Sequence, residues 1–258
     1  MKSFTSKSIV STILIGSVVA GSAFTTLPFT KELNPVASAA SYSFTQFLHD
    51  NAPGRTIKTS SSGLATVTNL SSTVVLVNKK RNLPSTYAPQ DLVVPNIPFS
   101  FSGSSPKKQM RKVAATAIEN LFAAAKKDGI DIKAVSGYRS YATQKSIFDR
   151  NASIKGEAVA NKTSAHPGQS EHQTGLAMDI SSASAGYDLQ QSFGNTKEGK
   201  WLKANAHKYG FIIRYGKDQE KLTGYSYEPW HVRYVGVYIA GEITSQNLTL
   251  EQYLERAK

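Results

Sequence analysis

The feature that most constrains this 258-residue sequence is that it contains no cysteine. No disulfide can hold its fold together, so the burial of apolar side chains has to do so, and hydrophobic residues make up 40% of the chain. The same absence excludes a thiolate zinc site, a cysteine nucleophile and a lipid-modified cysteine. Any metal ion must therefore be held by His, Asp or Glu side chains.

The first forty residues have the order of an export signal. Lys2 and Lys7 give a basic start, an apolar stretch covers residues 9–24, and small residues fill positions 37–40. This order is typical of a secretory signal peptide that is cleaved after position 39 or 40. An uncleaved membrane anchor is the alternative. No later stretch is long and apolar enough to span a bilayer, so we expect no stable membrane span after cleavage.

Basic residues outnumber acidic ones, with 30 Lys and Arg against 18 Asp and Glu, for a formal net charge of +12. The segment 1–40 holds three of the Lys and one of the Glu, so the chain without it keeps a net charge of +10. Such a charge suits a polyanionic partner, although it can also serve solubility alone. In an exported protein it favours anionic polymers of the cell wall, and we expect no nucleic-acid partner. The sequence thus predicts a secreted, cell-wall-associated protein, which we expect to be a monomer.

Beyond the signal peptide the chain divides into two parts. Residues 41–73 are rich in Ser, Thr, Asn and Gly with weak periodicity, which is typical of a tether or a loosely packed lead-in. Residues 74–258 mix helical and strand patterns without regular alternation, so we predict a single α+β domain with a small mixed or antiparallel sheet flanked by helices. Strands are predicted over 74–77, 130–134, 177–181, 211–215 and 231–235. Helices are predicted over 106–127, 141–151, 201–209 and from residue 250.

Capping residues mark the ends of these helices. Ser140 precedes one helix, Thr249 forms a capping box with Gln252, and Gly129 and Gly210 each follow a helix. The polar residues 152–170 between two elements are predicted to be a long loop, and long loops inside compact domains are often functional.

Two of the five histidines stand near a carboxylate at a suggestive spacing. His172 precedes Asp179 by seven residues, and Glu228 precedes His231 by three. His172, Asp179 and His231 would offer a metal two neutral imidazoles and one carboxylate, which leaves a centre with net positive charge that can acidify a bound water. The ligands can meet if the strands over 177–181 and 231–235 are neighbours.

A water activated by a metal still needs a group that accepts its proton. Glu228 is the natural candidate, because Pro229 stiffens the short connection between it and the next histidine. Glu171 is the other nearby carboxylate, but on an extended chain its side chain would point away from that of its neighbour. Arg139, between a strand and a helix, offers a fixed positive charge for developing negative charge, and Gln144 could point the same way.

Several other polar residues have a structural alternative. His166 lies in the long polar loop and could contact substrate. Tyr215 ends a strand and could either pack or bind, and Ser170 could simply cap or turn the chain. The rest are expected to be structural or solvated: His49, His207, Trp201 in the core and Arg214 at a strand edge.

Three ordered segments resemble the VanY-type zinc D-alanyl-D-alanine carboxypeptidases, a family that includes L,D-carboxypeptidase relatives. They are residues 136–140 with Gln144, residues 170–179, and residues 228–231. A further stretch over 77–89 is similar to the start of that domain. Three motifs in one order are more specific than any one of them alone. The part of the chain over 74–258 is therefore expected to be one zinc peptidase domain.

The resemblance implies roles for the residues singled out above. One zinc ion per chain would be held by His172, Asp179 and His231, with Glu228 as general acid and base. Arg139 would bind substrate and stabilise charge, holding either the terminal carboxylate or the developing oxyanion. The implied substrate is the peptidoglycan stem peptide, from which one terminal D-alanine is removed. Substrate contacts are implied for Arg139, Gln144, Ser170, Tyr215 and Trp230.

Alternatives to this function stay open at the level of sequence. Cleavage of a tetrapeptide would be L,D-chemistry, and cleavage of a pentapeptide would be D,D-chemistry. Nothing in the sequence indicates which configuration the pocket for the residue before the cleaved bond accepts. An endopeptidase would use the same zinc chemistry. A non-catalytic wall-binding module on the same scaffold would be expected to lack the base or a ligand, whereas Glu228, His172, Asp179 and His231 are all present.

Overall fold

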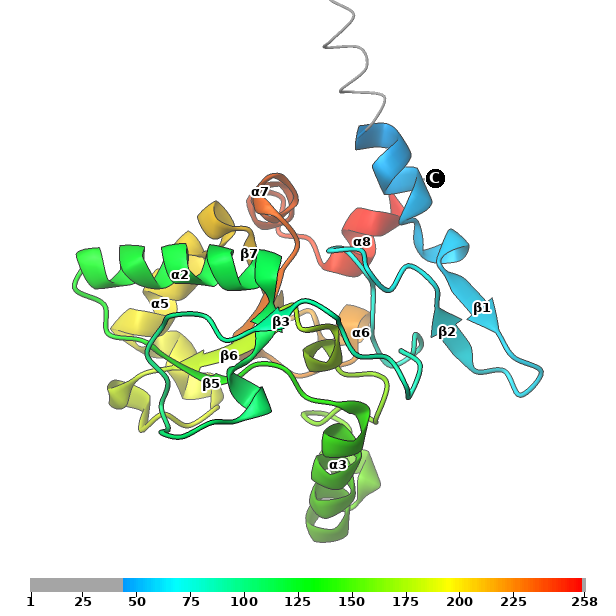
Figure 1. Cartoon of the computed structure of the whole chain (residues 1–258), viewed down its shortest axis with the longest axis horizontal. Helices are drawn as coiled ribbons and strands as arrows, with labels where there is room; N and C mark the ends of the chain where they lie inside the picture. The colour runs from blue at the N-terminus through cyan, green and yellow to red at the C-terminus, as the bar shows by residue number, and fades with distance from the viewer. Residues whose placement is uncertain (1–43, 257–258) are drawn as a thin grey trace, which may run out of the picture.

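The computed structural model describes residues 44–256 of the chain (Figure 1). The signal peptide predicted over residues 1–40 lies outside these residues. Within 44–256, no helix is both long and apolar enough to cross a membrane.

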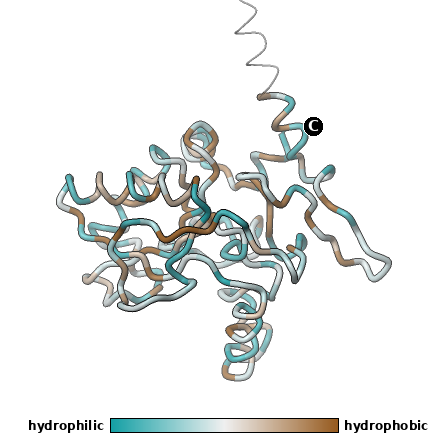
Figure 2. Tube along the Cα trace, viewed as in Figure 1, coloured by the Kyte–Doolittle hydropathy of each residue, from teal (hydrophilic) through white to brown (hydrophobic). Residues whose placement is uncertain are grey.

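The centre of the molecule is a four-stranded antiparallel sheet. Its strands are β5 (Lys133–Ser136), β6 (Ala177–Ser181), β7 (Phe211–Tyr215) and β8 (Glu228–Tyr234), in the order β5-β6-β8-β7. All five residues of β6 are buried, since this strand has a neighbour on each side and packing on both faces. Hydrophobic stretches lie where these strands run (Figure 2). The small antiparallel sheet with flanking helices confirms the predicted α+β fold class.

Helix α2 (Lys112–Lys127) supplies much of the core beside the sheet. Its apolar residues recur every three or four positions, which forms one buried stripe. That stripe belongs to the same core cluster as Met178, Ile180 and Val232 of β6 and β8. Gly129 follows the helix with φ +68°, the left-handed conformation that glycine adopts at a helix end. The buried residues of α2 are Ala114, Ala115, Ile118, Leu121, Phe122 and Ala125.

Helix α3 (Tyr141–Lys155) projects from the body of the molecule (Figure 1). Ser140 caps it as predicted, because its side chain accepts a hydrogen bond from the Thr143 amide at 3.2 Å. The helix is longer than expected and is followed by α4 (Glu157–Ala160), so the first part of the predicted 152–170 loop is helical and the rest is not.

A second apolar cluster lies beside the first and joins α7 (Val237–Ser245) and α8 (Leu250–Glu255) to the edge of the sheet. Thr249 and Gln252 form the predicted capping box at the start of α8. Val74 and Leu76 are buried in this cluster, but residues 74–77 form no strand. Side chains bind the backbone of this stretch instead of a partner strand, since Arg81 donates to the Leu76 carbonyl at 3.0 Å.

The segment before residue 74 is more ordered than a tether. It contains a helix over residues 44–50 and a hairpin of β1 (Ile57–Thr59) and β2 (Ala65–Val67). Val67 belongs to the main core, and the buried Arg81 guanidinium donates to the Thr56 carbonyl at 3.2 Å. Residues 44–73 therefore pack onto the rest of the protein. The domain boundary at residue 74 stays a prediction.

Shorter elements complete the fold. Met110, which the helical pattern included, lies instead in β4 (Met110–Arg111), because a 3-10 helix that begins at Pro106 and a short strand pair come before α2. Trp201 is only partly buried and packs against the core while its indole donates to Asp128 at 2.8 Å. The remaining helices and strands are β3 (Leu92–Val93), β4 (Met110–Arg111), α5 (Lys197–Asn205) and α6 (Glu220–Thr223). The 3-10 helices are η1 (Pro53–Arg55), η2 (Pro106–Lys108), η3 (Glu171–Thr174), η4 (Ala183–Ala185), η5 (Gln191–Asn195) and η6 (Ala206–Tyr209).

Candidate active site

A cavity of about 380 Å³ opens between α3 and the central sheet. It gathers the nine residues that the sequence and the resemblance assign to metal binding, catalysis and substrate binding, although these residues lie far apart in the chain. The candidates in its lining are Arg139, Gln144, Ser170, His172, Asp179, Tyr215, Glu228, Trp230 and His231.

Two side chains of the cavity are brought together by strand pairing. Asp179 of β6 stands directly opposite His231 of β8 in the antiparallel register. His172 lies in η3, and the chain reverses between it and Asp179 at Gly175, whose φ is +68°. A Cβ at Gly175 would come within 2.9 Å of side-chain atoms of Arg111, so both the backbone angle and the space favour glycine. One ligand atom from each of His172, Asp179 and His231 lies within 4.8 Å of the others.

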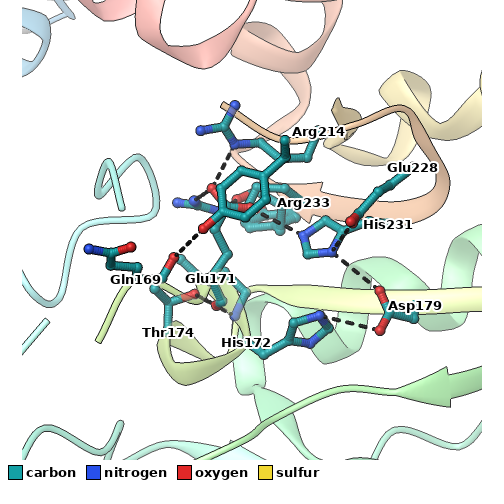
Figure 3. Close-up of polar contacts among 12 residues, drawn as sticks. Gln169, Glu171, His172, Thr174, Asp179, Arg214, Glu228, His231 and Arg233 are labelled. Carbon is teal, nitrogen blue, oxygen red and sulfur yellow. Dashed lines mark hydrogen bonds and ion pairs between the residues drawn. The ribbon is translucent and has the colours of Figure 1, made fainter. Parts of the chain in front are cut away.

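Hydrogen bonds fix which nitrogen of each ring faces the cluster (Figure 3). His172 Nδ1 lies 2.7 Å from the carbonyl oxygen of Gly137, which can only accept, so Nδ1 donates and Nε2 is left 3.3 Å from Asp179. His231 Nε2 lies 3.3 Å from a carboxylate oxygen of Glu171, so Nε2 donates and Nδ1 is left 3.2 Å from Asp179. Each imidazole therefore turns its other nitrogen toward the same carboxylate, in the orientation that metal-ligating histidines have.

Unpartnered buried atoms converge at this point. Among residues 44–256, His172 Nε2, Asp179 Oδ1 and Arg139 Nε are buried without a hydrogen-bond partner. Burial and the positive charge of Arg139 lower the pKa of His172 to about 4, so its imidazole is neutral near pH 7. Buried polar atoms normally have partners, and two neutral imidazoles with a carboxylate form a donor set that suits zinc. The residues present thus fit a zinc ion.

His231 is held differently from His172. Burial by itself lowers its pKa, but the nearby carboxylates of Asp179 and Glu171, each within 3.3 Å of a ring nitrogen, outweigh burial and raise the pKa to about 9. A cation that takes Nδ1 has to displace a proton from this ring, so metal binding releases a proton and weakens as the pH falls.

Glu228 begins β8 and is buried at the edge of the cluster. One of its carboxylate oxygens lies 3.7 Å from His231 Nδ1. Burial raises the pKa of Glu228 to about 8, and the negative charge of Asp179 adds to the effect. A carboxylate with a raised pKa is a stronger base than one in water, so Glu228 is suited to take and return a proton.

Arg139 follows β5 and is held from two sides. Its Nη1 donates to Gln144 Oε1 at 3.0 Å, and its Nη2 donates to Asp179 Oδ2 at 3.2 Å. Gln144 is itself fixed, because its amide donates to the Ala165 carbonyl at 2.7 Å. The guanidinium is thus a fixed positive charge at the cavity, which can bind a carboxylate or an oxyanion.

The other expected contacts line the same cavity. The ring of Tyr215 lies 5.0 Å from that of His231 and 4.6 Å from that of Tyr225, so it packs within the site as well as lining it. Ser170 occupies the residue before η3 but makes no side-chain cap there, which does not support the capping alternative. Tyr225 lines the cavity too, and no spacing signal pointed to it.

The other described histidines lie outside the lining of this cavity. His166 stacks on Phe148 at 3.9 Å between ring centroids and stands 3.6 Å from Glu157, so its proposed substrate contact stays a prediction. His207 lines a separate cavity of about 150 Å³ beside β7 and α7. His49 bonds to Gln46 in the N-terminal helix.

Two sequence expectations about charged residues are wrong. Arg214 is a fully buried ion-pair partner of Glu171 and Glu251 rather than a solvated edge residue. Glu171 lies in a 3-10 turn rather than on an extended chain, so its side chain reaches His231 instead of pointing away from the site. Arg233, two residues after His231 on β8, also binds Glu171 and was not singled out. The period of two along a strand is the signal that could have placed it on the same face.

Comparisons with known proteins agree with this geometry. The family model VanY, described as D-alanyl-D-alanine carboxypeptidase, matches residues 107–237. YodJ of Bacillus subtilis strain 168, which is named as a carboxypeptidase, is 54% identical over 196 residues, 76% of this chain and 72% of that protein. A structure of the LdcB LD-carboxypeptidase is 53% identical with a TM-score of 0.75, and the match covers 78% of this chain and 94% of that chain.

A more distant structure carries the metal. The D,D-pentapeptidase VanY from a VanB-type resistance cassette, solved as a mutant in complex with Zn(II), is 34% identical with a TM-score of 0.57. That match covers 70% of this chain and 98% of the other. The resemblance expected from three short motifs is thus confirmed over most of the described residues. This chain belongs to the VanY family of D-alanyl-D-alanine carboxypeptidases and is an enzyme of the metallopeptidase class.

Proposed function

We propose that this chain is a zinc-dependent carboxypeptidase that removes the terminal D-alanine from peptidoglycan stem peptides. The observation that carries the proposal is the convergence of His172, Asp179 and His231 within 4.8 Å, beside Glu228 in a cavity. The relative solved with Zn(II) supports the choice of metal, and the peptidoglycan recognition described for LdcB supports the substrate class.

The side chains divide the chemistry between them. His172 Nε2, His231 Nδ1 and the Asp179 carboxylate would hold one zinc ion, which when bound supplies Lewis-acid polarisation of the scissile carbonyl and a more acidic water. Glu228 takes a proton from the attacking water and returns it to the amine of the departing D-alanine. Its burial makes both transfers feasible near neutral pH, because the raised pKa lies close to the working range.

Arg139 is the fixed positive charge of the site. A carboxypeptidase substrate carries a terminal carboxylate, and the guanidinium is held in place with its Nε still unpartnered among the described residues. Arg139 either binds that carboxylate or stabilises the developing oxyanion. A stem peptide with an amidated C-terminus distinguishes the two roles. If Arg139 binds the carboxylate, the wild-type enzyme discriminates strongly against the amide and Arg139→Gln loses that discrimination.

The configuration of the residue before the cut decides between two candidate activities. The identity and TM-score to the LdcB LD-carboxypeptidase are higher than those to the D,D-pentapeptidase. This difference supports L,D-cleavage of tetrapeptide stems as the main reaction, with D,D-cleavage of pentapeptide stems as the second candidate.

A direct assay tests the proposal. Purified protein is incubated with stem tetrapeptide and stem pentapeptide, with and without a metal chelator, and the products are weighed by mass spectrometry. We expect loss of one alanine, chelator-sensitive and restored by zinc, with the tetrapeptide preferred. No cleavage of either peptide by zinc-loaded protein would favour a wall-binding module over an enzyme.

We also propose that the protein is exported and stays at the cell wall as a monomer. The signal-like segment 1–40 and the remaining net charge of +10 support this location. Fractionation of expressing cells should find the protein in the wall and medium with an N-terminus near residue 41. Extraction by high salt would identify the wall attachment as electrostatic.

A further inference from the structure

Glu171, at the wall of the cavity, belongs to a group of four charged side chains with Arg214, Arg233 and Glu251, here called the Glu171 cluster. Figure 3 shows the first three of them beside His231. The side chains of the first three are 0% exposed, and that of Glu251 is 13% exposed. Two carboxylates and two guanidiniums balance each other in charge. The proton transfers proposed above use none of these groups.

The two oxygens of the Glu171 carboxylate have separate tasks. Oε1 accepts from Arg214 Nε at 2.7 Å and from Arg233 Nη1 at 2.6 Å. Oε2 is thereby left for His231, whose Nε2 lies 3.3 Å away. Because a carboxylate with both guanidiniums bound stays ionised, it can only accept from His231, and the ring must carry its proton on Nε2.

Further contacts prevent the two guanidiniums from moving. Arg214 donates to both carboxylate oxygens of Glu251 in α8, at 2.8 and 2.6 Å. Arg233 donates to the carbonyl oxygens of Thr73 and Val75, at 3.0 and 2.9 Å. Glu171 is therefore anchored to α8 on one side and to residues 73–75 on the other.

Burying four charged groups in this way costs free energy. Removing four charges from water costs several kcal/mol per ion, and well-packed apolar residues in their place are often equally stable or more so. The cluster also lies directly behind a side chain of the proposed metal site. Its geometry is therefore better explained by what it does to His231 than by its contribution to stability.

We propose that Glu171 is a positioning residue, fixed by Arg214 and Arg233, which keeps the proton of His231 on Nε2 and aims Nδ1 at the metal site. Glu251 extends this support to the C-terminal helix by holding Arg214 in place. The inference rests on the proposed zinc site and adds a residue outside the ligand set to it.

Glu171→Gln tests the proposal because it keeps the size of the side chain and removes its charge. The amide can turn its NH₂ group toward His231, which would favour a proton on Nδ1, where the metal has to bind. We expect zinc affinity, measured by competition with a chromophoric chelator, to fall tenfold or more. In zinc-loaded protein with ¹⁵N-labelled histidine, we expect the Nε2–H signal of His231 to shift or disappear. A smaller loss of affinity, or a loss with an unchanged Nε2–H signal, overturns the proposal.

Controls separate this effect from loss of the fold and from failure of the proposed function. Asp91→Asn removes the same charge from a pair with Arg111, at 2.9 Å and outside the cavity, and should leave zinc affinity unchanged. If Glu171→Gln does not fold, Glu251→Gln keeps Glu171 and should still weaken zinc binding at least threefold, and unchanged affinity there overturns the proposal.

Failure of this proposal can be distinguished from failure of the proposed function. If wild-type protein binds no zinc, the proposed function itself fails. If wild type and Glu171→Gln bind zinc equally, only the positioning role of Glu171 fails.

Discussion

Replacing Arg214 with methionine measures how much the Glu171 cluster matters for stability. Methionine fills similar space without charge, so the substitution removes three hydrogen bonds and leaves only a small packing defect. Afterwards Glu251 keeps only Asn78 as a side-chain partner among the described residues, and Glu171 keeps Arg233 and His231.

The expected cost follows from burial. Removing one partner of a fully buried ion pair leaves an uncompensated charge and typically costs about 3–5 kcal/mol. For a chain of this size, each kcal/mol lowers the melting temperature by about 2–4 °C, so we expect a fall of roughly 6–20 °C. A solvated edge arginine would instead change the free energy of unfolding by no more than about 0.5 kcal/mol.

Urea unfolding followed by circular dichroism and tryptophan fluorescence gives the free energy of unfolding for each variant. Arg111→Met is the control, because its partner Asp91 is 39% exposed and such pairs contribute at most about 1 kcal/mol. In the double variant with Glu251→Gln, we expect a coupling of at least about 1 kcal/mol with Arg214→Met. A loss below 1 kcal/mol in Arg214→Met would show that the buried ionic cluster does not form in solution.

Three further outcomes are expected. Glu228→Ala should keep bound zinc and lower kcat about a hundredfold or more, checked by metal analysis beside the peptide assay, and a fully active variant would remove Glu228 as the base. His172→Ala should lose zinc together with activity, and zinc at wild-type stoichiometry would remove His172 from the ligand set. The pKa of Glu251 lies below its ordinary value of 4.5, mainly because the Arg214 charge outweighs burial, so its contribution to stability is complete above pH 4.5 and is lost as the pH falls. Between pH 6 and pH 3.5, wild type should therefore lose up to about 1.4 kcal/mol more than Glu251→Gln in chemical denaturation, and parallel pH profiles would contradict this.

Local sequence patterns predicted the secondary structure correctly where interactions within a few residues determine it. The strands over 177–181 and 211–215 and the caps at Ser140 and Thr249 appear as expected, since apolar runs and side-chain caps act within a few residues. Residues 74–77 failed as a strand for the opposite reason. Their apolar character correctly predicted burial. Strand formation, however, requires a neighbouring strand, and here the backbone carbonyls of Leu76 and Val75 accept hydrogen bonds from the guanidinium groups of Arg81 and Arg233 instead.

In the candidate site too, some residues could be predicted from sequence motifs and others could not. The nine residues chosen from spacing and resemblance all line a common cavity, because ordered motifs carry the chemistry that a shared site requires. Glu171 and Arg214 were misjudged, since their partners lie 37 to 62 residues away in the chain and no local pattern reports such pairs. Their roles depend on the 3-10 turn at Glu171 and on the burial of β7.

The sequence by itself determined which chemical groups are available to this protein. It has no thiols, it has His, Asp and Glu side chains for a metal and a base, and it has turn residues such as Gly175 that let them converge. Only the tertiary structure decided their state. The register of β6 against β8 places Asp179 opposite His231, and burial changes the pKa of Glu228 and His172. The choice of nitrogen on each histidine comes from partners across the fold. Distances and dielectric environment set these properties, and both exist only once the chain has packed.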